Sequence, residues 1–224
     1  MLVRQARMLT RPIFNSFRSF SSISHKRLAK ALENELEYDH KIYKEEDEIS
    51  SYMRNSGFKL FEREDHTLVT LQKKFNDAEV EITFHVKAPS VDEADEPGES
   101  QSNLEQDEPP GIYIDFQVLV KKPNTNTGFI FECLCLDQEI TVANVVFSDN
   151  LANIKRQSTF GRKGGEYRGP QFVNLHKKVQ NLLTEYLKDF GVDDNLAFFI
   201  EMYSIDKEHR CYMEWLRHVK NFVN

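Results

Sequence analysis

Residues 78–87, Ala-Glu-Val-Glu-Ile-Thr-Phe-His-Val-Lys, decide the fold class, because apolar and polar side chains alternate along them without a break. Successive side chains of a strand point to opposite faces, so this pattern predicts one buried row and one exposed row. The buried row would consist of Val80, Ile82, Phe84 and Val86. A half-buried strand of this kind is typical of an antiparallel sheet with one face in water.

Further strands are expected on both sides of this stretch. Residues 111–121 alternate in the same way, with Ile112, Ile114, Phe116, Val118 and Val120 in the apolar row. Other segments have strand composition, and the short Asn-, Asp- or Gly-containing connections between several of them suit hairpins. These segments are 58–63, 67–74, 128–136 and 139–148, with a seventh, short strand between Gly165 and Val173. The middle of the chain therefore predicts an antiparallel sheet.

Helices are expected at the two ends of the chain. No Pro or Gly occurs from Ser24 to about Asn55, which predicts one long helix ended by Gly57. Its apolar stripe would be Leu28, Tyr38, Ile42, Ile49 and Tyr52. Residues 170–190 and 193–224 repeat apolar side chains every three or four positions, as helices do. We expect the first and last helices to cover each other beside the sheet, in an α+β fold.

The N-terminal segment is basic, since the first acidic residue of the chain is Glu33. Arginines stand at positions 4, 7, 11 and 18, and the run Arg18-Ser19-Phe20-Ser21-Ser22 is typical of a mitochondrial transit peptide and its cleavage point. We predict that residues 1–20 are the transit peptide, that cleavage follows Phe20, and that residues 21–224 form a single domain. Lys26, Arg27 and Lys30 would then belong to the mature first helix. An unstructured tail is the alternative interpretation.

Other targeting signals are excluded by the same residues. The arginines interrupt every apolar stretch that could serve as a secretory signal. No run of about 20 apolar residues occurs, so no membrane span is expected.

The charge of the chain favours basic partners. The formal net charge is −7, and loss of the four arginines in residues 1–20 would change it to −11. A general binder of the nucleic-acid backbone needs dense Lys and Arg, which such a chain lacks.

Residues 88–110 form an acidic insertion between two expected strands. Prolines, serines and few apolar residues predict a mobile loop that cannot bury enough surface to order itself. Its acidic side chains are candidate client-binding residues: Asp92, Glu93, Asp95, Glu96, Glu99, Glu105, Asp107 and Glu108. The alternative is a linker that only increases solubility.

A basic, glycine-containing loop follows the last expected strand. Its candidate contacts to RNA or another anion are Lys155, Arg156, Arg162, Lys163 and Arg168. The run from Gly161 to Gly165 lacks the Gly-Lys-Ser/Thr ending of a phosphate-binding loop. A flexible surface loop is the alternative interpretation.

Catalytic and metal-binding patterns are weak. Cys133 and Cys135 are expected on one side of a strand, where small core-facing cysteines are the simpler interpretation. With His209 and Cys211 they do not have the spacing of common zinc knuckles. The histidines suggest no Ser/His/Asp arrangement. We therefore predict no enzyme activity, no metal and no cofactor.

Five runs of residues match the sequence of a known family. The runs are Gly169-Pro170-Gln171-Phe172, Leu187-Lys188-Asp189-Phe190, Gly191-Val192-Asp193-Asp194-Asn195-Leu196, Lys207-Glu208-His209 and Tyr212-Met213-Glu214-Trp215-Leu216. They resemble the mitochondrial acidic matrix protein family, also called the mitochondrial glycoprotein family, whose animal member is the complement globular-head-binding protein. The chain departs from the most acidic members in its modest acidic insertion, in Cys211 and in the basic residues of 155–168.

The resemblance implies a seven-stranded antiparallel sheet flanked by N- and C-terminal helices, assembled as a doughnut-shaped homotrimer. It also implies a matrix protein with many partners that supports mitochondrial translation, ribosome assembly and oxidative phosphorylation. Two functional hypotheses follow. The first is a non-enzymatic scaffold or chaperone whose acidic loop holds basic clients such as ribosomal or RNA-processing factors. The second is an RNA-associated accessory factor in mitochondrial RNA processing that uses the basic loop at 155–168.

Overall fold

The structure, a computed structural model, describes residues 23–44, 46–86, 113–151 and 167–224. Two helices, α1 (Ile23–Ile42) and α2 (Asp47–Ser56), precede the sheet. The strands are β1 (Lys59–Glu62), β2 (Leu68–Lys74), β3 (Glu79–His85), β4 (Ile114–Lys121), β5 (Gly128–Leu136) and β6 (Glu139–Ser148). A short 3-10 helix, η1 (Phe172–Asn174), and helices α4 (Lys177–Asp189) and α5 (Asp194–Val223) follow. The predicted α+β class is confirmed.

The six described strands form one sheet in the order β1-β2-β3-β4-β5-β6, and every neighbouring pair is antiparallel. The apolar row predicted from residues 78–87 is buried, and Ile82 stands opposite Leu71 on one side and Val118 on the other. Asp137 and Gln138 both have positive φ, as a two-residue turn between β5 and β6 requires.

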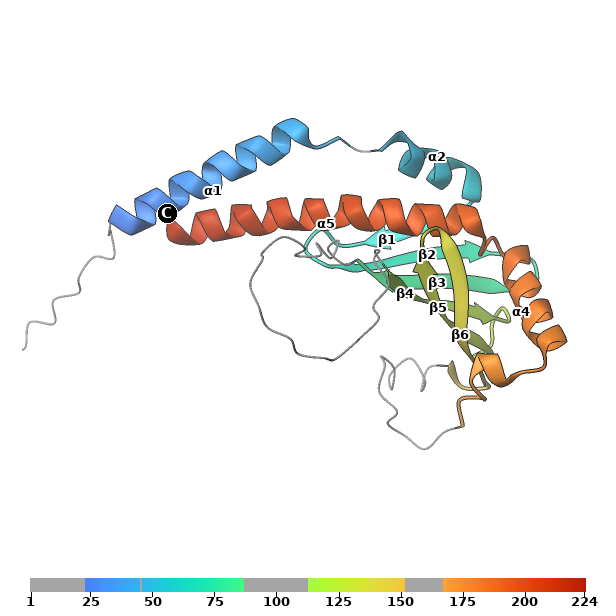
Figure 1. The fold of residues 1–224 in the computed structure, drawn as a ribbon. Coiled ribbons are helices and arrows are strands. Elements are labelled where there is room, and N and C mark those ends of the chain that lie inside the picture. The colour runs from blue at the N-terminus through green and yellow to red at the C-terminus, as the bar shows by residue number, and fades with distance from the viewer. Residues whose placement is uncertain (1–22, 45, 87–112, 152–166) are drawn as a thin grey trace, which may run out of the picture.

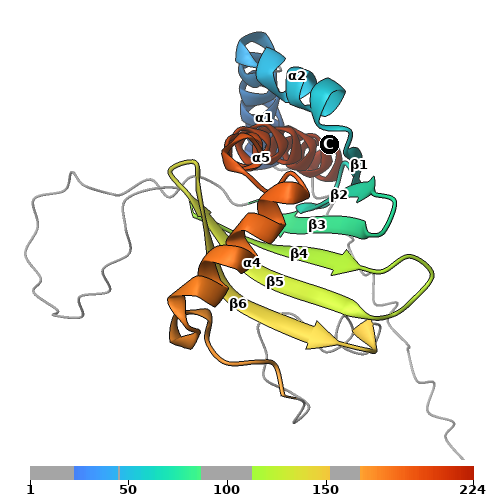
Figure 2. The same cartoon turned by 90° about the vertical axis from the view of Figure 1, so that its right-hand side faces the viewer.

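The core lies between one face of the sheet and helices α4 and α5. In Figure 2, α4 crosses the sheet in front of β4 to β6, while α5 lies over the β1 side with α1 and α2 beyond it. Tyr186 of α4 contacts the rings of Phe129 and Phe131 on β5, and Tyr203 of α5 contacts Phe84 on β3. None of the helices in the described residues is long and apolar enough to span a bilayer.

A second, smaller cluster lies apart from the main core, and the alternating pattern did not predict it. It consists of Leu119, Ile130, Val146 and Leu151, all buried. Leu119 lies between Val118 and Val120 of the main core, so β4 is apolar on both faces at this point.

The prediction of one helix from Ser24 to Asn55 is wrong, because the helix is interrupted between Ile42 and Asp47. The chain turns there although it contains no Pro or Gly, and the Tyr43 hydroxyl donates a hydrogen bond to Asp206 of α5. The predicted apolar stripe is also wrong for α1. Leu28, Tyr38 and Ile42 are exposed, whereas Leu32 is buried. A tertiary contact therefore overrides the local helical tendency.

The helix expected from Pro170 begins only at Lys177, after η1. The His176 side chain accepts a hydrogen bond from the Lys178 amide and so caps its first turn. The expected seventh strand lies partly outside the described residues. Its described part forms a single antiparallel bridge, from Gln171 to Asn144. Gly169 has a φ of 82°, outside the strand region, and Pro170 has no N–H to donate, so a longer ladder cannot form there.

Candidate functional site

Most of the site residues predicted from the sequence lie outside the described residues. These are all eight acidic candidates, Asp92, Glu93, Asp95, Glu96, Glu99, Glu105, Asp107 and Glu108, and the basic candidates Lys155, Arg156, Arg162 and Lys163. Their roles stay predictions.

Arg168 is the one predicted site residue that the structure describes. Its Nη2 lies 2.6 Å from Glu132 Oε1, and the other oxygen of Glu132 accepts a hydrogen bond of 3.3 Å from Asn144. The next residue, Gly169, lies so close to β6 that an added Cβ would be 2.7 Å from the Val145 carbonyl oxygen. Arg168 therefore holds its segment against the sheet, and one of its guanidinium nitrogens is already paired with a carboxylate.

The helices α1 and α5 form an arm that extends beyond the sheet (Figure 1). They run antiparallel, with Leu32 of α1 and Met213 and Leu216 of α5 buried. Glu33 bonds Lys220 at 3.1 Å, and this cation together with Lys30 holds the pKa of Glu33 below its ordinary value. These contacts confirm that the first and last helices cover each other.

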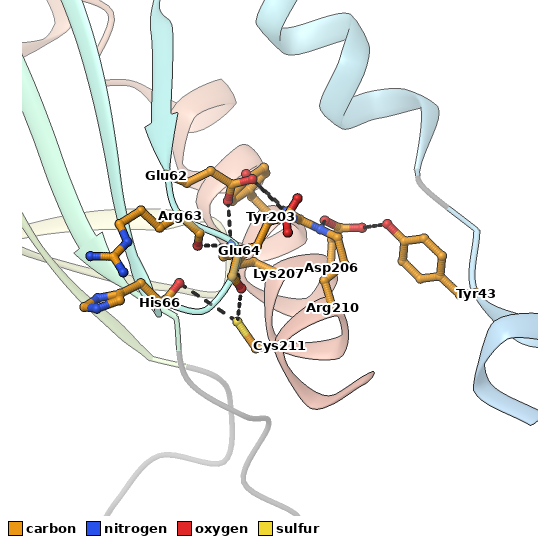
Figure 3. A network of polar contacts seen from close by, with 10 residues as sticks. All are labelled: Tyr43, Glu62, Arg63, Glu64, His66, Tyr203, Asp206, Lys207, Arg210 and Cys211. Carbon is orange, nitrogen blue, oxygen red and sulfur yellow. Dashed lines mark hydrogen bonds and ion pairs between the residues drawn. The ribbon is translucent and has the colours of Figure 1, made fainter. Parts of the chain in front are cut away.

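An ionic network that the sequence patterns do not predict anchors the arm to the sheet. Lys207 of α5 is 0% exposed, which is exceptional for a lysine. Its Nζ donates a hydrogen bond of 2.6 Å to the Arg63 carbonyl oxygen and lies 3.0 Å from Glu62 Oε2 (Figure 3). The positive charge is thus paired where water is excluded, as a buried charge must be.

Arg210, one turn further along α5, completes the anchor. It donates to Glu62 at 3.0 Å, to Asp206 at 2.8 Å and to the Tyr203 hydroxyl at 3.2 Å. Burial lowers the pKa of Arg210, but its hydrogen bonds to the carboxylates of Asp206 and Glu62 raise the pKa by more than burial lowers it. The net pKa lies above the ordinary value, so the guanidinium stays charged. Burial likewise pushes the pKa of Glu62 upward, and hydrogen bonds from Tyr203, Arg210 and Lys207 outweigh this effect and lower it.

The same network reaches the α1–α2 connection. Asp206 accepts from Arg210 on one oxygen and from Tyr43 at 2.8 Å on the other. The Tyr43 ring meets His209 edge-on, and His209 lies 3.6 Å from the buried carboxylate of Asp39. One chain of polar contacts thus links β1, α5 and α1, and it fixes the direction of the arm. The sequence contains one signal for this network. Lys207 and Arg210 stand three residues apart in α5, beside apolar positions that are buried.

The cysteines are placed as the simpler interpretation predicted. Cys133 and Cys135 are buried in the main core, and burial raises the pKa of both thiols, that of Cys135 to about 12. The Cys135 thiol donates to Glu201 and to the Ala197 carbonyl oxygen. No group of three or more His, Cys, Asp or Glu side chains in the described part of the chain is arranged to hold a metal ion.

Comparisons with known proteins agree with this fold. A family model described as mitochondrial glycoprotein matches residues 32–223. The chain is 26% identical over 173 residues to the mitochondrial acidic protein mam33 of Schizosaccharomyces pombe, a match that covers 70% of this chain and 64% of that protein. It is 26% identical over 164 residues to the mitochondrial complement component 1 Q subcomponent-binding protein of Mus musculus, with 70% and 59% covered. The matched region thus spans less than two thirds of these relatives.

Two solved structures share the fold. The crystal structure of the Trypanosoma brucei p22 protein superposes with a TM-score of 0.68 at 24% identity, covering 91% of this chain and 100% of that one. A Leishmania major protein, described as a sequence homologue of human p32, gives a TM-score of 0.68 at 19% identity, with 90% and 99% covered.

Proposed function

The chain belongs to the mitochondrial glycoprotein family, and from this premise we propose that it is an acidic mitochondrial matrix protein, a non-enzymatic scaffold or chaperone for basic proteins. Its clients would be ribosomal or RNA-processing proteins, and its role would support mitochondrial translation, ribosome assembly and oxidative phosphorylation. The relatives support a mitochondrial location, since both are named mitochondrial proteins. The complement-binding relative also offers a precedent for protein binding.

The observation that carries the proposal is the position of the acidic segment in the sheet. Strands β3 and β4 pair directly, up to Phe84 opposite Phe116, so the segment 88–110 leaves and re-enters the sheet at neighbouring points. A hairpin at this position needs only a few residues. The segment is therefore an addition to the fold, and loops of this length are commonly functional.

The charge distribution points to the same segment. Residues 88–110 contain eight acidic and no basic side chains, a formal charge of −8, while the entire chain carries −7. The protein that would begin at Ser21 carries −11, so everything outside the segment carries only −3. A dense anionic segment on a weakly acidic body attracts basic proteins at short range, where salt screens it least.

We also propose that three copies assemble as a homotrimer, the state implied by the family resemblance. Three copies would carry three acidic segments, which raises the effective concentration of binding sites for one extended basic client. Light scattering on the protein beginning at Ser21 measures this directly. A monomer would contradict it.

Salt-dependent binding tests the proposed function. A fluorescent poly-lysine peptide serves as the basic client, and its affinity should fall steeply above an ionic strength of about 0.15 M, where the Debye length is roughly 8 Å. Binding that is insensitive to salt would contradict the mechanism.

Two variants of equal charge locate the binding. The first neutralises part of the segment, with Asp92→Asn, Glu93→Gln, Asp95→Asn and Glu96→Gln. The second neutralises four exposed carboxylates of the described fold, with Glu37→Gln, Glu64→Gln, Glu139→Gln and Glu185→Gln. We expect the first to weaken poly-lysine binding more than the second. Equal losses would mean that net charge, not the segment, attracts the client.

RNA binding by the basic loop is the alternative function. Such binding predicts that alanine at Lys155, Arg156, Arg162 and Lys163 reduces the salt dependence of RNA affinity. The ion pair of Arg168 with Glu132 favours the scaffold, because the carboxylate offsets the charge of one of the five cations proposed to contact RNA.

A further inference from the structure

The tip of the arm is basic although the protein is acidic. We define the tip as residues 24–33 of α1 and 214–224 of α5. It contains five Lys and Arg side chains and two Glu side chains, a formal side-chain charge of +3 against −7 for the chain. Each carboxylate is shared by two basic groups, namely Glu33 by Lys30 and Lys220, and Glu214 by Arg217 and His218. The carboxylates of the tip therefore cannot neutralise its cations, and Lys26 and Arg27 add to the excess.

Large apolar side chains are exposed at the same place. Phe222 is 91% exposed, Trp215 56% and Leu28 46%. Phe222 and Trp215 lie seven residues apart on α5, about two helical turns, so they share one side of the helix. Large aromatic groups left in water at the end of a helix pair indicate a surface that is covered in use.

The position of the tip limits what can cover it. In Figure 1 the C-terminal end of α5 lies beside the start of α1, at the end of the arm farthest from the sheet. The arm is held in this direction by the ionic network of Lys207 and Arg210. The tip is thus a projecting end, and such a shape fits a broad, deformable surface better than a groove.

We propose that the tip binds the surface of an anionic phospholipid bilayer. Phe222 and Trp215 enter the headgroup region, where aromatic side chains are favoured, and Lys26 and Arg27 contact lipid phosphates. A bilayer offers phosphate and apolar layers side by side, which matches both properties of the tip. A nucleic acid would satisfy the cations but has no apolar layer for Leu28. This inference lies beyond the proposed function and does not depend on it.

Vesicle binding tests the inference, and Trp215 is its reporter because it is the only tryptophan of the chain. The protein beginning at Ser21 is used, since the arginines of residues 1–20 would bind anionic vesicles by themselves and every described helix and strand begins at Ile23 or later. With vesicles of phosphatidylcholine and phosphatidylglycerol, we expect flotation with the lipid and a shift of Trp215 emission to shorter wavelength. With phosphatidylcholine alone, we expect neither.

Matched variants assign the binding to the tip. Lys26→Gln with Arg27→Gln should weaken binding about 25-fold, from roughly fivefold for each charge near an anionic surface. Lys177→Gln with Lys178→Gln removes two adjacent exposed cations from the first turn of α4 and should change little. Phe222→Ser should likewise weaken binding more than Val173→Ser, which also removes an exposed apolar side chain.

Three results would overturn the inference. The first is an equal loss of binding in the α1 and α4 variants. The second is flotation without any change in Trp215 emission. The third is an emission shift of the same size with soluble polyphosphate, which would mean that the tip recognises phosphate rather than a bilayer.

Discussion

Replacing Lys207 by Met should destabilise the protein by about 3 kcal/mol. Methionine matches the lysine stem as far as Cε and lacks only the terminal ammonium group, so the change removes mainly the ionic contacts. The Arg63 carbonyl oxygen loses a donor at 2.6 Å, and Glu62 loses its partner at 3.0 Å. An unpaired buried acceptor costs about 1–3 kcal/mol and removal of one member of a buried ion pair about 3–5 kcal/mol. Because Glu62 keeps Arg210 as a partner, the two costs are not fully additive, and the total should lie near the lower end of the ion-pair range.

Urea unfolding followed by far-ultraviolet circular dichroism, at one protein concentration, measures this cost. Lys59→Met is the control, since Lys59 is exposed on the same strand as Glu62 and should change stability by no more than about 0.5 kcal/mol. Combining Lys207→Met with Glu62→Gln should cost at least about 1 kcal/mol less than the sum of the single changes, because neither leaves the other unpaired. The proposed ionic anchor would be refuted if Lys207→Met and Lys59→Met lost the same unfolding free energy. It would also be refuted if the double variant lost the full sum of the two single losses.

Further predictions concern the same network and the edge of the sheet. The pKa of Glu62 in the folded protein lies below its ordinary value of 4.5, so the stability that its charge contributes is present above pH 4.5 and is lost as the pH falls through the folded pKa. The difference in unfolding free energy between wild type and Glu62→Gln should therefore be largest near neutral pH and should shrink when unfolding is measured in acid. Tyr43→Phe removes a hydrogen bond to the carboxylate of Asp206 and should cost about 1–2 kcal/mol; hydrogen exchange should quicken in α1 before it does in the sheet, and uniform quickening would contradict this. Gly169→Ala places a Cβ against the Val145 carbonyl oxygen at positive φ and should cost more than about 1 kcal/mol in thermal unfolding, with an unchanged melting temperature as the contrary result.

The strands could be predicted well because their signal is local. Alternation along residues 78–87 and 111–121 follows from burial of one face, and the structure has β3 and β4 at these places with Val80, Ile82 and Phe84 in the core. The alternation places Leu119 in the exposed row, yet this side chain is buried, because β4 is covered on both faces there.

The helices and the anchor were harder because tertiary contacts decide them. Nothing near Tyr43 in the sequence stops a helix, and the break coincides with its bond to Asp206 on a distant helix. A pattern of polar and apolar residues predicts that Lys207 is exposed, because lysine is charged. It is buried because Glu62 pairs with its charge and the Arg63 carbonyl oxygen accepts its hydrogen bond. The acidic and basic candidate residues could be proposed from composition alone, since charge density is a property of the sequence.

Replacing residues 88–110 by a short Asn-Gly turn tests the central claim most directly. Strands β3 and β4 are already paired, so we expect the fold to persist and its stability to rise by about 1–2 kcal/mol from the shorter loop. If the acidic segment binds basic clients, the shortened protein keeps its circular dichroism spectrum and loses most of its affinity for poly-lysine at low salt. A folded variant that binds poly-lysine as tightly as the full chain would contradict it.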